Sequence, residues 1–127
     1  PIVYKNSIAS AQIKSAILFA GLYSNGTTKV IESVRSRDHT ERMLKYFGAK
    51  IKTSGKCVSV RGGRELKAKS FGIPGDISSA SFFMIAATLL KGSRIKIRNV
   101  SINPTRAGIL KVLYRMGADV SHVYSNA

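Results

Sequence analysis

A short polar segment, Ser10-Ala11-Gln12, stands directly before an apolar stretch that has the spacing of a helix. The first backbone N–H groups of a helix have no partner within the helix and carry a partial positive charge, so they can hold a phosphate or carboxylate group. The Ser10 hydroxyl and the Gln12 amide can add hydrogen bonds to the same anion. The spacing alone favours a plain serine N-cap with Gln12 in solvent, because serine caps are common.

A second candidate, Arg37, lies in the segment SRDHTE between a predicted strand and a predicted helix. Layered α/β folds place ligand-binding groups in such loops. A guanidinium binds phosphate with two parallel hydrogen bonds, which lysine cannot provide, although a solvated arginine also fits this position. We expect Asp38 to cap the helix or to pair with a nearby arginine. We expect a structural role for His39, because no nucleophile or orienting carboxylate can be assigned to it.

The polar pattern returns at Asp76-Ile77-Ser78-Ser79, now with an acid at its head. An acidic side chain satisfies the N–H groups that would otherwise hold an anion, so we interpret this copy as structural. The loop 103–106, Asn-Pro-Thr-Arg, similarly predicts capping and packing. The sequence contains no metal-ligand spacing, glycine-rich phosphate loop or Ser/His/Asp set, and we expect Cys57 to be a small strand residue.

The spacing of apolar residues predicts the elements that position these side chains. Helical spacing predicts helices at 10–24, 38–47, 76–91 and 104–116. Alternation of β-branched residues predicts strands at 1–5, 27–34, 93–100 and 118–124, and a hairpin at 50–63. In the first helix, the expected buried face consists of Ile13, Ala16, Ile17, Ala20 and Gly21.

The element order helix, strand, helix, strand, strand occurs once complete and once cut short. Gly26 and Gly92 are 66 residues apart, and Gly48 and Gly117 are 69 apart, so a three-residue insertion relates the two halves. We therefore predict an internal repeat with one unit at about 1–70 and an incomplete one at about 71–127. One unit leaves the backs of its helices exposed, so we expect the chain to be a piece of a larger repeat protein.

Composition limits the function classes. The 127 residues are 44% hydrophobic, which predicts a packed domain, and no apolar run approaches the roughly 20 residues that span a bilayer. No leader-like segment is visible, so we expect a cytoplasmic chain without a membrane partner. Its 21 Lys+Arg against 6 Asp+Glu give a net charge of +15, which favours anionic partners. A basic nucleic-acid-binding module is an alternative, but the basic residues are dispersed and only 8% of residues are aromatic, so we expect no nucleic acid.

Three motifs together resemble the 5-enolpyruvylshikimate-3-phosphate (EPSP) synthase family: Ser-Ala-Gln at 10–12, Ser-Arg-Asp-His-Thr-Glu at 36–41 and Asn-Pro-Thr-Arg at 103–106. The resemblance covers nearly the whole chain and weakens only at 52–70 and in the last residues. It implies an α+β fold of α/β-type βαβαββ units, of which the chain would hold about one and a half to two. Residues 1–127 would then form part of an enolpyruvyl transferase domain.

The resemblance also implies a carboxyvinyl transferase of aromatic amino acid (chorismate) biosynthesis. Such an enzyme moves the enolpyruvyl group of phosphoenolpyruvate to shikimate 3-phosphate, without a metal or an organic cofactor. By motif position, Ser10, Ala11, Gln12 and Arg37 would bind shikimate 3-phosphate, and Gln12 would also contact phosphoenolpyruvate. The proton-transfer residues would lie outside this segment, so we expect no catalytic residue and no activity from the segment alone. Its partners would be the two substrates and the remaining repeats. The related UDP-N-acetylglucosamine enolpyruvyl transferase, with the same fold but different lead motifs, is an alternative.

Overall fold

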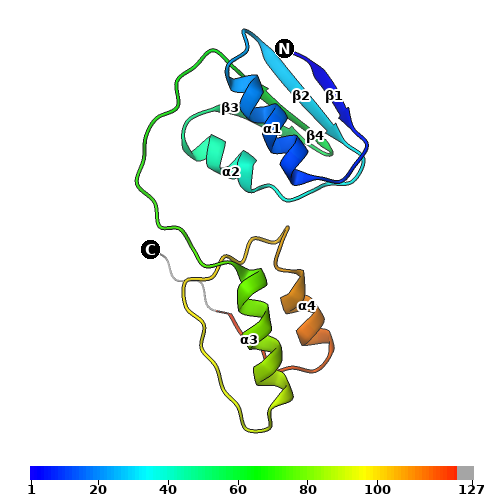
Figure 1. The fold of residues 1–127 in the computed structure, drawn as a ribbon, viewed down its shortest axis with the longest axis vertical. Helices are drawn as coiled ribbons and strands as arrows, with labels where there is room; N and C mark the ends of the chain where they lie inside the picture. The colour runs from blue at the N-terminus through cyan, green and yellow to red at the C-terminus, as the bar shows by residue number, and fades with distance from the viewer. Residues whose placement is uncertain (123–127) are drawn as a thin grey trace. The chain divides into compact units, whose positions relative to one another are not determined.

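The computed structural model describes residues 1–122, and the chain divides into two compact units, Pro1–Phe71 and Gly72–Ala127. The first unit has the element order βαβαββ (Figure 1). Its elements are β1 (Val3–Asn6), α1 (Ala11–Leu22), β2 (Thr27–Glu32), α2 (His39–Tyr46), β3 (Lys50–Ser54) and β4 (Cys57–Arg61). This is the repeat unit that the sequence predicts.

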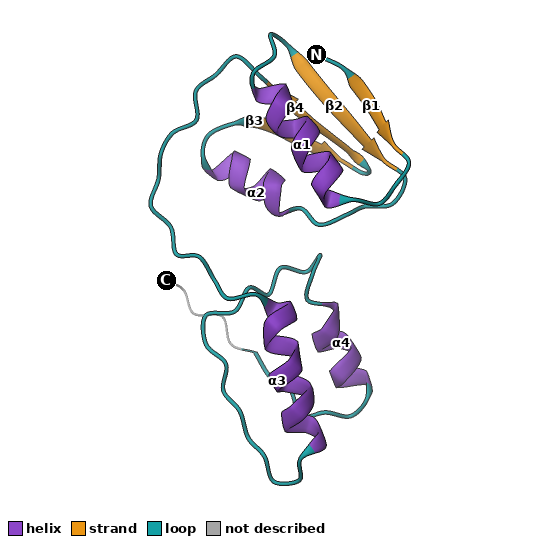
Figure 2. Cartoon of the chain, viewed as in Figure 1, coloured by secondary structure: helices purple, strands orange, loops and turns teal. Residues whose placement is uncertain are grey.

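The four strands form one sheet in the order β1-β2-β4-β3. β1 and β2 are parallel and are joined through α1, whereas β4 pairs antiparallel with both β2 and β3. Both helices lie on the same face of this sheet (Figure 2), with α1 against β2 and β4 and α2 against β3. The inward-facing residues of the strands and helices enclose a small apolar core of Leu18, Val30, Leu44, Val58 and Val60.

Helix α1 packs very closely on the sheet because Gly21 has no side chain. A Cβ atom at this position would lie 2.8 Å from Val60 Cγ1 and 2.9 Å from Thr28 Cβ. The buried residues of α1 are Lys14, Leu18 and Gly21. The predicted buried face was therefore partly wrong, since Ala16 and Ala20 are exposed. The reason is that α1 is apolar on nearly all sides, so its spacing does not reveal which side meets the sheet.

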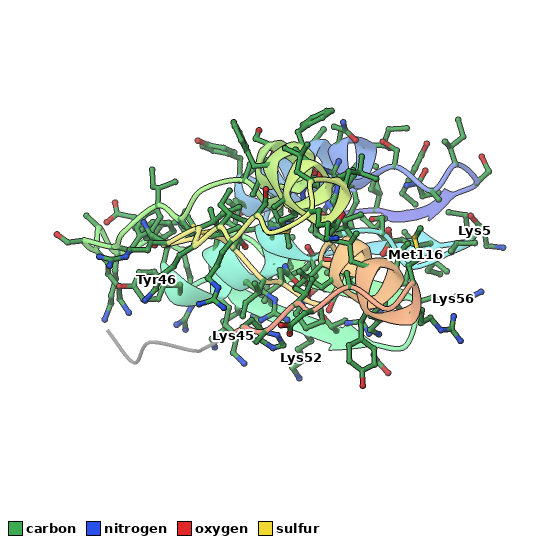
Figure 3. All side chains as sticks on the ribbon, turned by 90° about the horizontal axis from the view of Figure 1, so that it is seen from below. Lys5, Lys45, Tyr46, Lys52, Lys56 and Met116 are labelled. Atoms are coloured by element: carbon green, nitrogen blue, oxygen red, sulfur yellow. The ribbon has the colours of Figure 1, made fainter. Side chains whose placement is uncertain are left out.

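The hairpin of β3 and β4 turns at Gly55, which has φ +55°. Cys57 is the first residue of β4 and is half-buried, as expected of a small strand residue. The lysines are spread over several elements of this unit. Lys5 on β1, Lys45 on α2 and Lys52 on β3 are exposed at different places on its surface (Figure 3).

The second unit contains α3 (Ile77–Leu89) and α4 (Gly108–Arg115). The predicted strand 93–100 does not form; within the described residues this region has only an isolated parallel bridge between Gly75 and Val100. A strand needs a neighbour, and β2 in the first unit has one on each side. Residues 118–122 form no strand either, and the rest of the predicted strand 118–124 lies outside the described residues. The last helix begins at Gly108, after a turn at 104–107, and not at Pro104 as predicted.

The helices of the two units recur at the spacings found in the sequence. α1 begins at residue 11 and α3 at residue 77, which is 66 residues later. α2 spans 39–46 and α4 spans 108–115, so both ends are displaced by 69 residues. Gly48 and Gly117, which follow these helices, have φ values of +89° and +84°. α2 and α4 therefore share their length and their termination at a glycine, whereas α3 has 13 residues and α1 has 12.

Candidate functional site

The two polar segments that the sequence singles out follow neighbouring parallel strands. Residues 7–10 connect β1 to α1, and residues 33–38 connect β2 to α2. Because β1 and β2 point in the same direction, both connections leave the same edge of the sheet (Figure 2). Open α/β sheets bind ligands at the carboxyl ends of such strands.

The first turn of α1 has the geometry of an N-cap. Ser10 has an extended backbone, and its Oγ accepts a hydrogen bond from the Ile13 N–H at 3.3 Å. The same hydroxyl lies 3.3 Å from Gln12 Oε1, and Gln12 is exposed. Within residues 1–122, the N–H groups of Ala11 and Gln12 have no acceptor. Two backbone donors and two side chains can therefore face an anion here.

Arg37 is half-buried, and its backbone is tied to α1. The Lys14 ammonium donates a hydrogen bond to the Arg37 carbonyl oxygen at 2.9 Å. Lys14 lies one turn after Ser10, to whose carbonyl its own N–H donates at 3.2 Å. The Arg37 guanidinium has no hydrogen bond or ion pair with any of residues 1–122. Its charge is therefore not neutralised by any of these residues. We call Ser10, Ala11, Gln12 and Arg37 the anion site, because the sequence predicts that these four residues bind an anion; that binding stays a prediction.

A buried charged cluster that sequence reasoning missed lies beside the anion site. Lys14 is 1% exposed and forms ion pairs with Glu32 at 3.2 Å and with Glu41 at 2.7 Å. The Ser36 hydroxyl and N–H both donate to Glu32 Oε1. We call Lys14, Glu32, Ser36 and Glu41 the Lys14 cluster. The alternation Thr28, Val30, Glu32 would have revealed a carboxylate on the inward face of β2, which needs a cationic partner.

The neighbours of Arg37 have structural contacts. Asp38 is at the N-cap position of α2 without a capping bond from its side chain, and its Oδ2 accepts from Arg42 Nε at 3.0 Å. The predicted pairing of Asp38 with a nearby arginine is confirmed. His39 is the first residue of α2, and its structural role stays a prediction. Thr40 and Ser15 hydroxyls lie 2.6 Å apart and join α2 to α1.

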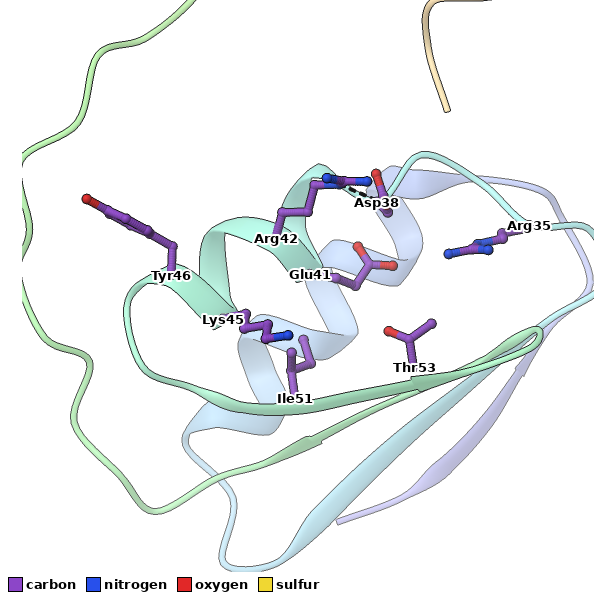
Figure 4. A pocket seen from close by; sticks show the side chains of 8 residues that line it. All are labelled: Arg35, Asp38, Glu41, Arg42, Lys45, Tyr46, Ile51 and Thr53. Carbon is purple, nitrogen blue, oxygen red and sulfur yellow. Dashed lines mark hydrogen bonds and ion pairs between the residues drawn. The ribbon is translucent and has the colours of Figure 1, made fainter. Parts of the chain in front are cut away.

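An open hollow of about 580 Å³ lies between α2 and β3 (Figure 4). It is lined by Arg35, Asp38, Glu41, Arg42, Lys45, Tyr46, Ile51 and Thr53. No residue of the anion site lines it. Its charged side chains include the Asp38–Arg42 pair, so two of its five charges are already matched with each other.

At the corresponding position in the second unit, the N-cap residue of α3 is an aspartate, Asp76. Asp76 accepts a hydrogen bond from the Ser78 N–H at 3.0 Å, and Arg106 Nε lies 3.3 Å from Asp76 Oδ1. The Ser78 hydrogen bond, followed by the Arg106 contacts, lowers the pKa of Asp76 below its ordinary value. Asn103 Oδ1 accepts from the N–H and hydroxyl of Thr105, both at 3.0 Å. The predicted capping by Asp76 is confirmed, whereas Asn103 caps a turn before α4 and not the helix itself. That these segments have only a structural role stays a prediction.

Other site types find no support in the described part of the chain. Among residues 1–122, no three His, Cys, Asp or Glu side chains are grouped so that they could hold a metal ion. No helix in that range has the length and apolar character needed to cross a membrane.

Comparison with known proteins decides the family. The family model of EPSP synthase (3-phosphoshikimate 1-carboxyvinyltransferase) matches residues 1–126. The chain belongs to the EPSP synthase family. This assignment favours EPSP synthase over the UDP-N-acetylglucosamine alternative, and the α+β βαβαββ unit described above is consistent with the enolpyruvyl transferase fold.

The EPSP synthases that this chain matches are much longer than the chain itself. A 3-phosphoshikimate 1-carboxyvinyltransferase of Petrotoga mobilis is 59% identical over 121 residues, which cover 94% of this chain and 28% of the relative. That of Shouchella clausii is 54% identical over 120 residues, with the same coverage. The solved EPSP synthase from Acinetobacter baumannii superposes with a TM-score of 0.88 at 48% identity, covering 94% of this chain and 27% of that one. The chain thus spans little more than a quarter of the length of these proteins.

Proposed function

We propose that this chain is the part of a 3-phosphoshikimate 1-carboxyvinyltransferase that binds the phosphate of shikimate 3-phosphate. The complete enzyme carrying this segment, here called the parent enzyme, transfers the enolpyruvyl group of phosphoenolpyruvate to the 5-hydroxyl of shikimate 3-phosphate. In the addition, the hydroxyl oxygen loses its proton and bonds to the central carbon of phosphoenolpyruvate, while the methylene carbon gains a proton. In the elimination, inorganic phosphate leaves from the central carbon and the methyl group loses a proton, which restores the double bond. The proposal gives no residue of this segment a proton-transfer role.

One observation carries the proposal: unpartnered donors from the loops after β1 and β2 lie at the same edge of the sheet. The N–H groups of Ala11 and Gln12 offer the partial positive charge of the α1 terminus. The Ser10 hydroxyl and Gln12 amide add donors, and Gln12, being exposed, can also reach phosphoenolpyruvate. Arg37 supplies a full charge and two parallel hydrogen bonds. Together these groups match a tetrahedral dianion.

The remaining repeats of the parent enzyme are the second class of partner in this proposal. Helix α3 is apolar on most sides and exposes Phe82 at 76% and Leu89 at 78% in this chain. Exposed apolar area of this kind indicates a packing surface. We therefore propose that residues 1–127 are part of a larger enolpyruvyl transferase domain that also supplies the other substrate contacts.

The test is to replace Arg37 and Gln12 with alanine, separately, in the parent enzyme. Loss of a charge-assisted hydrogen-bonding group costs about 1.5–3 kcal/mol, so the Kd for shikimate 3-phosphate should rise about 10- to 100-fold in Arg37→Ala. Gln12→Ala should show a smaller rise, because its amide is neutral. Isothermal titration calorimetry measures the Kd of each variant for shikimate 3-phosphate. The same titration with shikimate, which lacks the phosphate, shows whether the lost affinity is specific to the phosphate.

The matched control is Lys52→Ala, which removes an exposed cation from β3, the edge strand on the opposite side of the sheet from β1. It should bind with wild-type affinity. Unchanged affinity in both Arg37→Ala and Gln12→Ala would refute the assignment of the anion site.

A further inference from the structure

The Lys14 cluster connects the two halves of the anion site through a single side chain. The Lys14 ammonium contacts Glu32 at the end of β2, the Arg37 carbonyl in the following loop, and Glu41 in α2, at 3.2, 2.9 and 2.7 Å. An ammonium has three N–H donors, so all three are used, each on a different segment. Lys14 itself belongs to α1, whose first turn is the other half of the site.

The Lys14 cluster contributes little net stability to the fold for the number of charges that it buries. Lys14, Glu32 and Glu41 are all buried, and together they place one cation among two carboxylates. Desolvation of buried charges offsets most of their mutual attraction, and apolar side chains of similar volume often stabilise as well. Glu41 Oε2 has no hydrogen-bond partner within the described residues, which adds a further cost. These costs indicate that the cluster serves geometry more than stability.

The geometry it sets is that of the loop carrying Arg37. Ser36 is held at the end of β2 through its N–H and hydroxyl on Glu32, and the next residue is held through its carbonyl by Lys14. The backbone of Arg37 is therefore fixed from both sides of the Ser36–Arg37 peptide, while its guanidinium is left without a partner among residues 1–122.

We propose that Lys14 is a positioning residue for Arg37: its tether to the Arg37 carbonyl sets where the guanidinium meets the phosphate at the α1 terminus. This inference rests on the proposed function. Lys14 does not touch the substrate in it, since its own side chain is 1% exposed and its donors are all used. Without the tether, the backbone of Arg37 loses its hydrogen bond to α1, and its guanidinium is no longer held at one place relative to that helix.

The experiment removes the charges of Lys14, Glu32 and Glu41 together in the parent enzyme. Lys14→Met alone leaves two buried carboxylates unpaired, so the test variant is Lys14→Met/Glu32→Gln/Glu41→Gln. Glutamine at position 32 keeps an oxygen for Ser36. We expect this triple variant to fold with a melting temperature near that of the wild type. Its Kd for shikimate 3-phosphate should rise about tenfold, while its affinity for unphosphorylated shikimate stays unchanged.

Two further variants separate positioning from a general structural effect. In an Arg37→Ala background, the triple substitution should change the Kd for shikimate 3-phosphate less than twofold, because the group it positions is already gone. Glu41→Gln alone is the matched control: it neutralises the cluster but keeps the tether from Lys14 to Arg37, so affinity should match the wild type.

Each other outcome overturns the inference. Unfolding of the triple variant would show that the cluster is kept for stability, and wild-type affinity would show that the tether is irrelevant. An equal loss with and without Arg37 would show that Lys14 acts independently of it. Arg37→Ala by itself tests the proposed function. If Arg37→Ala bound shikimate 3-phosphate with wild-type affinity, both the proposed function and the positioning role of Lys14 would be refuted. If Arg37→Ala lost affinity but the triple variant did not, only the positioning role of Lys14 would be refuted.

Discussion

Ser10 and Asp76 differ in the charge that they place at the N-terminus of a helix. They lie 66 residues apart, each as the N-cap of a long apolar helix. Each N-cap accepts one N–H of its own helix, and in each first turn two N–H groups have no acceptor among residues 1–122: those of Ala11 and Gln12 in α1, and those of Ile77 and Ser79 in α3. The two termini differ in charge, because Ser10 is neutral whereas Asp76 brings a negative charge and pairs with Arg106. The charge at each helix start can be predicted from the sequence alone, whereas its consequence for anion binding stays a prediction.

The difference predicts a pH-dependent contribution from Asp76. Its pKa is lowered in the folded state, chiefly by the Ser78 N–H and then by Arg106. The stabilisation is therefore present above the unfolded-state value of about 4 and is lost as the pH falls through the lower folded-state value. Asp76→Ala in the parent enzyme should melt below the wild type at pH 7, and the gap should narrow steadily below pH 4.

Asp119→Ala provides the control, since it removes an exposed carboxylate of the same unit. Its melting temperature should follow the wild type at every pH. A gap for Asp76→Ala that stays constant from pH 7 to pH 3 would contradict the role given to this carboxylate.

At the scale of elements, periodicity predicted the strands and helices of the first unit, but it did not predict how α1 faces the sheet. β2 alternates cleanly, and α2 has a clear apolar side that buries Leu44. α1 is apolar nearly all round, and its buried face includes Lys14, a residue that no apolar pattern selects. Sequence was therefore enough to propose the residues of the anion site, which stay a prediction, while the Lys14 cluster beside them depends on tertiary contacts among three segments.

The contact of α1 with the sheet predicts the effect of a substitution at Gly21. Alanine is favoured over glycine in a helix by about 1 kcal/mol, but here its Cβ would lie 2.8 Å from Val60 Cγ1. Overpacking typically costs about 1–3 kcal/mol, so we expect Gly21→Ala to lower the free energy of unfolding of the parent enzyme by about 1–2 kcal/mol. Chemical denaturation measures this change.

Gly108→Ala is the matched substitution, because Gly108 opens α4 and a Cβ there meets nothing within 4 Å. It should leave stability unchanged or raise it by up to about 1 kcal/mol. If Gly21→Ala proved as stable as Gly108→Ala, the close packing of α1 on β2 and β4 would be wrong.

At the scale of the whole molecule, the strands form where their neighbours are present. The first unit has all four strands of its sheet, whereas the alternating stretch 93–99 in the second unit has no ladder partner among the described residues. Strand propensity is a preference for a pleated, partly buried surface, so a pattern predicts a strand only where such a surface exists. The chain spans 28% of the Petrotoga mobilis relative, and α3 exposes large apolar side chains. Both facts favour a packing role within a larger protein.

The most direct measurement is a crystal structure of the parent enzyme with shikimate 3-phosphate bound. The account predicts phosphate oxygens within about 3 Å of Ser10 Oγ and the Arg37 guanidinium, at the first turn of α1. It would be contradicted if the phosphate were bound elsewhere while the Ala11 and Gln12 N–H groups and Arg37 faced only solvent.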